Sequence, residues 1–170
     1  VLRQAEIAGA APLTPIQRWF FAHDLPDPNH WTQAFLFRLA RPLDVHTLKR
    51  ALGDLVRHHA ALRTAFYVHA QEVRPEPAFV FRHVEGATGE SALQQCCLEA
   101  QRALRVGDGM LLSAVYFDAS LGAESPRLYL ALHHLAVDGV SWRILLEDLE
   151  ALLNGKSPEP KTPPRRFVIC

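Results

Sequence analysis

Two adjacent histidines, His133 and His134, are the residues whose type and position point most directly to chemistry. They end the apolar run 127–134, and Asp138 and Gly139 follow after a short gap. Neutral imidazole has the ordinary pKa closest to neutral pH, so it is the usual general base. Two imidazoles and a nearby carboxylate are also a set that can bind a metal ion. We expect no metal here, because no second ligand cluster accompanies them.

Only one of these histidines can face a cleft if the apolar run is a strand. Residues 127–134 are mostly apolar and of strand length. Successive side chains of a strand point to opposite faces. One imidazole can therefore reach a substrate, and the other must pack or hydrogen-bond on the far side. A histidine at a strand end is more often structural than catalytic, so this pattern alone leaves the roles open.

A turn and a long helix are predicted after the histidines. Asp138 is placed to cap the helix, and Gly139 tolerates backbone angles that other residues resist. Asn154-Gly155 is a typical helix end. The predicted apolar face consists of Trp142, Leu145, Leu146, Leu149, Leu152 and Leu153, and the predicted polar face carries Glu147, Asp148 and Glu150.

The segment HHLAVDG, residues 133–139, resembles the HHxxxDG motif of the condensation-domain superfamily of nonribosomal peptide synthetases. RHHAALRTAF, residues 57–66, is similar to the second motif of that superfamily. PLTPIQRWFF and PNHWTQAFLF, within residues 12–37, resemble the opening of its epimerization branch. The flank VSWRILLEDL also resembles that branch, because condensation domains more often carry Trp where this chain has Val140. The resemblance covers about residues 12–161.

The resemblance implies an α/β fold of the α+β type, a mixed sheet flanked by helices, as in one half of a chloramphenicol-acetyltransferase-like domain. Family domains have two such halves in a V with a tunnel between them. At 170 residues the chain matches only the N-terminal half. We expect a linker or frayed tail over residues 1–11, the N-terminal subdomain over 12–155, and a Pro-rich basic tail over 156–170, which resembles a truncated or frameshifted end.

The implied activity is inversion, from L to D, of the α-carbon of an aminoacyl or peptidyl thioester. The substrate would be carried on the phosphopantetheine of a peptidyl carrier protein, with no cofactor bound directly. By resemblance, His134 is the catalytic acid/base beside the tunnel and His133 is structural. Asp138 would fix the histidine loop, with Arg63 as its counter-ion. A second acid/base, usually a Glu, would come from the missing C-terminal half.

Further residues are candidates for contacts with the substrate. His30 and Trp31 resemble residues at the tunnel mouth, although packing also explains Trp31. The enolate formed by proton removal needs hydrogen-bond donors. The backbone of residues 138–140, Ser141 and Trp142 lie where a helix N-terminus could supply them. Ser141 is equally explained as an ordinary first-turn residue.

Two alternatives stay open at this point. A condensation domain would use the same histidine to assist attack of an amine on an acyl thioester. A non-catalytic module or remnant would dock a carrier protein without turnover. We expect these 170 residues alone to be inactive as an epimerase. Exchange of the α-proton for deuterium separates the first hypothesis from the other two.

Composition narrows the class of protein. The chain is 49% hydrophobic and 21% charged with a formal net charge of zero, as in an ordinary globular domain. It has no basic block, which argues against nucleic acid and against electrostatic membrane binding. It has neither a membrane-spanning apolar run nor a signal-peptide pattern at its start. Cys96 and Cys97 are adjacent within a helical pattern, and Cys170 leaves an odd count, so we expect a reducing, cytoplasmic location.

The remaining pattern alternates helices and strands. Strands are predicted over 31–39, 78–83 and 110–118, and the last forms a hairpin with 127–134. Helices are predicted over 44–59 and 90–104, and a short one begins at Thr14-Pro15. His58 and His59 end the helix of residues 44–59, where the helix dipole favours them.

Overall fold

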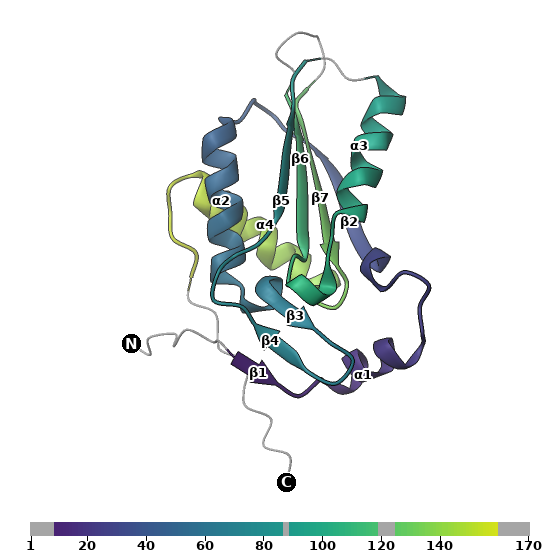
Figure 1. Ribbon diagram of the computed structural model, residues 1–170. Coiled ribbons are helices and arrows are strands. Elements are labelled where there is room, and N and C mark those ends of the chain that lie inside the picture. Colours follow the sequence, from purple (N-terminus) through teal and green to yellow (C-terminus); the bar gives the residue numbers. More distant parts are fainter. Residues whose placement is uncertain (1–8, 87–88, 119–124, 160–170) are drawn as a thin grey trace.

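The main sheet has four strands in the order β2-β7-β6-β5 (Figure 1). The computed structural model describes residues 9–86, 89–118 and 125–159. Strands β2, β7 and β6 pair antiparallel, whereas β5 lies parallel to β6. Their bounds are β2 Thr32–Arg38, β5 Val80–Val84, β6 Leu112–Phe117 and β7 Arg127–His133.

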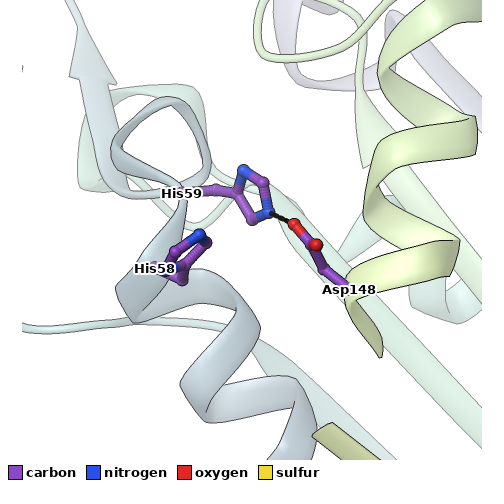
Figure 2. Close-up of side chains that lie close together, drawn as sticks. All are labelled: His58, His59 and Asp148. Atoms are coloured by element: carbon purple, nitrogen blue, oxygen red, sulfur yellow. Dashed lines mark hydrogen bonds and ion pairs between the residues drawn. The ribbon is translucent and has the colours of Figure 1, made fainter. Parts of the chain in front are cut away.

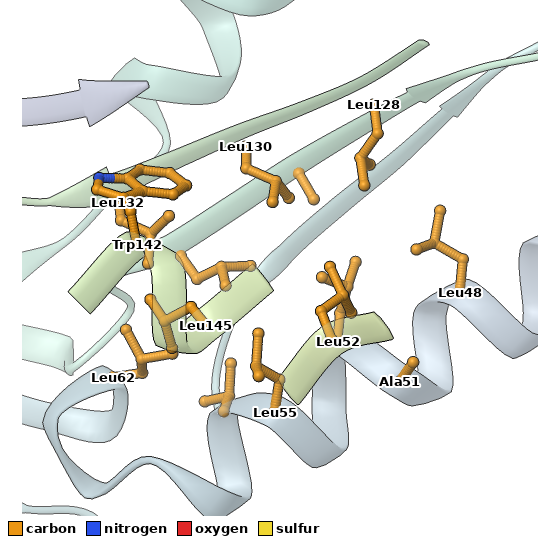
Figure 3. Packing of buried hydrophobic residues seen from close by; sticks show 14 of the residues in the cluster. Leu48, Ala51, Leu52, Leu55, Leu62, Leu128, Leu130, Leu132, Trp142 and Leu145 are labelled. Atoms are coloured by element: carbon orange, nitrogen blue, oxygen red, sulfur yellow. The ribbon is translucent and has the colours of Figure 1, made fainter. Parts of the chain in front are cut away.

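Helices cover both faces of this sheet because its central strands are apolar on both faces. Helices α2 (Val45–His58) and α4 (Gly139–Leu153) pack on one face. Helix α3 (Glu90–Arg102) packs on the other. The larger core therefore lies between the sheet and the α2–α4 pair (Figure 3), and alternate residues of β7, namely Leu128, Leu130 and Leu132, point into it.

A second, three-stranded sheet lies beyond one end of the main sheet (Figure 1). It consists of β1 Gly9–Ala11, β4 Gln71–Val73 and β3 Thr64–Phe66, all paired antiparallel. The prediction of a linker over 1–11 is therefore wrong for residues 9–11, which pair with β4 through their backbone. Residues 1–8 and 160–170 lie outside the described residues, and 156–159 contain neither helix nor strand.

Helix α1 (Pro15–Ala22) begins as predicted, with Thr14 at the cap and Pro15 at the first position. The Thr14 backbone N–H donates to Gln17 Oε1 at 2.8 Å. Of its apolar residues, Phe20 is buried whereas Ile16 and Trp19 stay exposed. The described residues also include three short 3₁₀ segments, namely η1 Pro28–His30, η2 Ala60–Arg63 and η3 Val106–Asp108.

The observed elements confirm the predicted mixed α/β fold, with helices flanking the sheets. The predicted strands and the three long helices occur with ends shifted by a few residues, and the 110–118 and 127–134 strands pair as a hairpin. Within the described ranges, every helix is too short or too polar to cross a bilayer.

Candidate active site

His133 is the last residue of β7, and its side chain is completely buried. Its Nε2–H donates to the Pro28 carbonyl at 2.8 Å, and the Leu135 backbone N–H donates to its Nδ1 at 3.2 Å. Burial lowers the pKa of His133 to about 4. The ring is therefore neutral near pH 7, and both of its nitrogens are engaged by backbone groups.

His134 follows directly and faces the opposite way. Its backbone N–H donates to the Trp31 carbonyl at 2.8 Å, which continues the β2–β7 pairing by one residue. Its Nδ1 lies 2.7 Å from the Val137 carbonyl oxygen. A carbonyl can only accept, so Nδ1 carries the proton and Nε2 of the neutral ring presents a lone pair. The two histidines therefore face opposite sides, as strand alternation predicts.

One further side chain, Gln33, reaches the Nε2 atom of His134, and Trp142 in turn binds Gln33. Gln33 Nε2 lies 3.3 Å from His134 Nε2, and Trp142 Nε1–H donates to Gln33 Oε1 at 2.8 Å. Gln33 comes from β2 and Trp142 from α4, so three separate elements meet at this point. Sequence reasoning missed Gln33. Its signal was its position on the same strand face as Phe35 and Phe37.

Aromatic rings enclose the histidines from the side of α1. The Trp31 ring centroid lies 4.7 Å from that of His134, and the Phe20 ring stacks on Trp31 at 4.8 Å. Phe20 also meets His133 edge-on at 5.8 Å. Of the candidate tunnel residues, Trp31 thus contacts His134, whereas His30 is exposed on η1.

Asp138 caps helix α4 as predicted. Its Oδ1 accepts from the Ser141 backbone N–H at 2.8 Å and from Ser141 Oγ at 2.6 Å. These bonds hold the pKa of the exposed Asp138 carboxyl below its ordinary value. Ser141 therefore has both donors turned toward Asp138 and not toward a developing enolate. Gly139 is the first helical residue, without a positive φ and with open space around its α-carbon, so it does not use the backbone freedom that glycine offers.

The predicted ion pair between Arg63 and Asp138 is absent from the described part of the chain. Arg63 is buried, and its Nη1 donates to the Arg74 carbonyl at the edge of the small sheet. Asp138 is exposed, and Ser141 satisfies its carboxylate. Helix capping supplies the hydrogen bonds that a counter-ion would otherwise provide, so the predicted ion pair does not form.

His58, His59 and Asp148 form a second polar cluster, between the end of α2 and the middle of α4 (Figure 2). Asp148 Oδ2 lies 2.8 Å from His59 Nε2, and one ligand atom of each residue lies within 4.8 Å of the others. This donor set could hold a metal ion, but it also forms a satisfied hydrogen-bonded pair without one. Asp148 is buried, so its prediction as part of a polar helix face is wrong.

The main sheet, its flanking helices and the loop that carries the histidines define half of a chloramphenicol-acetyltransferase-like domain. Residues 7–168 match the family described as "Condensation domain", and the chain belongs to that family. Its fold is similar to the epimerization domain from the third module of tyrocidine synthetase B, with a TM-score of 0.82 and 28% identity. That likeness covers 97% of this chain and 40% of the solved one.

Curated relatives are much longer than this chain. A linear gramicidin synthase polypeptide of Brevibacillus parabrevis is 42% identical over 160 residues, which are 86% of this chain and 2% of the relative. N-(5-amino-5-carboxypentanoyl)-L-cysteinyl-D-valine synthase of Amycolatopsis lactamdurans is 38% identical over 94% of this chain and 4% of its own length. The chain therefore spans a small part of the synthetases that it matches.

Proposed function

We propose that this chain is the N-terminal part of an epimerization domain of a nonribosomal peptide synthetase. The substrate is an aminoacyl or peptidyl thioester on the phosphopantetheine of a carrier protein. The thioester makes the α-proton acidic, because the enolate spreads its charge onto the carbonyl oxygen. His134 Nε2 takes or returns this proton on one face of the α-carbon. A second acid/base, by resemblance a Glu from the other half of the domain, acts on the opposite face.

The observation that carries this proposal is the tautomer of His134, with the proton on Nδ1 and a lone pair on Nε2. The Val137 carbonyl fixes the proton of the neutral ring on Nδ1, at 2.7 Å, so that Nε2 is an acceptor. A general base needs that lone pair and a ring that is held in place. His133 cannot take this role, because it is buried and both of its ring nitrogens are bonded to the backbone.

The choice of the epimerization branch is supported by the comparisons. The likeness to the tyrocidine epimerization domain has a TM-score of 0.82. The first condensation domain of the calcium-dependent antibiotic synthetase gives 0.70 at 23% identity, which reflects the fold alone. The Amycolatopsis relative is named for a product that contains D-valine. Val140 in place of Trp after Asp138-Gly139 points the same way.

Exchange of the α-proton tests the proposal. The full-length protein, meaning a polypeptide that contains this chain and the second half of the domain, is incubated in D₂O with its carrier protein loaded with an aminoacyl group. The released amino acid is then analysed by mass and by chiral chromatography. We expect incorporation of one deuterium together with the D-enantiomer. Peptide formation with an added amine acceptor and no exchange would identify a condensation domain. Carrier binding without either reaction would identify a docking module.

A further inference from the structure

Gln33 is placed by strand alternation to meet the proposed base. It lies opposite Leu132 in the antiparallel pairing of β2 and β7. Side chains of directly paired residues share a face of the sheet, and so do residues two apart. Gln33 and His134 therefore lie on one face, the face that α4 covers, and Trp142 in the first turn of α4 hydrogen-bonds to Gln33.

The hydrogen bonds fix the direction of the Gln33 amide. An indole N–H can only donate, so the Gln33 atom 2.8 Å from Trp142 Nε1 must be the oxygen. The amide nitrogen is then turned toward His134 Nε2 and donates to its lone pair at 3.3 Å. Trp142 is buried, so reversing the amide would leave its indole N–H without an acceptor.

This direction matters because it favours one protonation state of His134. An amide N–H stabilises the ring with a lone pair at Nε2 and opposes the ring with a proton there. At 3.3 Å the bond is long compared with the 2.8 Å bond to Trp142, so Gln33 is held more firmly by Trp142 than by His134. We therefore expect the α-carbon of a bound substrate to displace the amide from Nε2 while Trp142 keeps its bond to Gln33.

We infer that Gln33 is a positioning residue that, fixed by Trp142, keeps His134 neutral and ready to accept the α-proton. This inference rests on the proposed function. Gln33 does not need to touch the reacting atoms in this role. The decisive feature is the donor-to-acceptor direction of the hydrogen bonds from Trp142 through Gln33 to His134. Replacing the amide nitrogen of Gln33 by an oxygen can reverse the bond to His134.

Gln33→Glu reverses that polarity with almost no change in shape. One carboxylate oxygen still accepts from Trp142 Nε1–H, and the other faces His134 Nε2 as a charged acceptor. We expect ¹⁵N signals of labelled histidine in the full-length protein to show His134 protonated on both ring nitrogens at pH 7. We expect kcat for α-proton exchange to fall about 10²-fold, the lower range for a positioned proton-transfer group. KM should change less than about threefold, because uniform binding is not altered.

Two further variants keep the test decisive. Gln94→Glu makes the same chemical change on α3, where the exposed Gln94 contacts Glu90, and should leave the His134 signals and kcat as in the wild type. Gln33→Met removes the donor to His134, and with it the acceptor of Trp142 Nε1–H, without adding charge. It should lower kcat about three- to tenfold, the effect of one neutral hydrogen bond, with Nδ1 still protonated.

The inference is overturned if Gln33→Glu folds and leaves His134 neutral at Nε2, or if Gln33→Met and Gln33→Glu both exchange like the wild type. A wild-type protein that shows no exchange would count against the proposed function instead. In that case the His134 ring signals in the two Gln33 variants still decide the inference, since they are read without substrate.

Discussion

His133 and His134 are chemically identical neighbours whose surroundings give them different properties. His133 points into the region packed by Phe20 and is bonded at both ring nitrogens by backbone groups. His134 points to the α4 side and keeps Nε2 as an acceptor. Strand alternation therefore lets His133 be structural while His134 is available as the proposed base.

Burial of neutral His133 predicts a loss of stability in acid. Its pKa in the folded chain is about 4, below the ordinary value of 6.5, so the unfolded chain binds more protons between these values. Stability from this group is full above pH 6.5 and falls as the pH drops toward 4, by about 3 kcal/mol in all. Urea unfolding of the full-length protein between pH 7 and pH 4 measures it.

His133→Gln should reduce this pH dependence, although it lowers stability at pH 7. The exposed His46 on α2 offers a matched control, and His46→Gln should keep the wild-type slope. Equal slopes for the wild type and His133→Gln would contradict the assignment of a neutral, buried ring.

At the scale of elements, the contact between α2 and α4 contains a polar pair inside an apolar core. Asp148 is 5% exposed, and its carboxylate lies 2.8 Å from His59 Nε2 (Figure 2). Leu145 and Leu149 beside it are buried against the sheet. The pair therefore links the end of α2 to α4, the helix whose first turn carries Trp142.

Asp148→Ala should destabilise the protein by about 1–3 kcal/mol, because the His59 ring, whose side chain is only 13% exposed, loses this hydrogen bond. Asp54→Ala is the matched control, since Asp54 pairs with Arg57 at 2.6 Å on the exposed side of α2. That change should cost less than about 1 kcal/mol. Chemical denaturation compares the two, and an equal effect would show that the buried pair has no special structural role.

Local patterns predicted the elements well because periodicity reports which face of a segment is buried. The 44–59 pattern became α2 with Asp44 as its cap, where Asp44 Oδ1 accepts from the Thr47 N–H at 2.8 Å. The histidine strand and the cap at Asp138 were also predicted. Strand β1 was not, since three small residues carry no periodic signal and depend on pairing with β4.

Polar contacts between distant segments could not be predicted in the same way. Gln33 and Trp142 are far apart in sequence, and their hydrogen bond exists only because β2 and α4 meet beside β7. The Arg63–Asp138 pair was inferred from resemblance, and capping by Ser141 replaced it. A weak signal existed for Gln33 and Asp148: each is a polar residue at a position where the surrounding periodicity favours an apolar one.

At the scale of the whole molecule, the proposed base lies at one end of the main sheet. His134 is the single acid/base group that we propose this chain contributes to the reaction. Within the described ranges, no carboxylate is hydrogen-bonded to His134. Inversion needs a donor on the other face of the α-carbon, and the chain spans 40% of the solved epimerization domain that it resembles. We therefore expect the 170 residues alone to show no efficient turnover, as their resemblance to one half of a domain implies.

The most direct test of the proposed mechanism is α-proton exchange by the His134→Ala variant of the full-length protein. We predict a loss of at least about 10²-fold in exchange, with an unfolding midpoint close to that of the wild type, since His134 is only partly buried. His46→Ala should exchange normally. A folded His134→Ala protein that retains wild-type exchange would contradict the assignment of His134 as the base and with it the proposed mechanism.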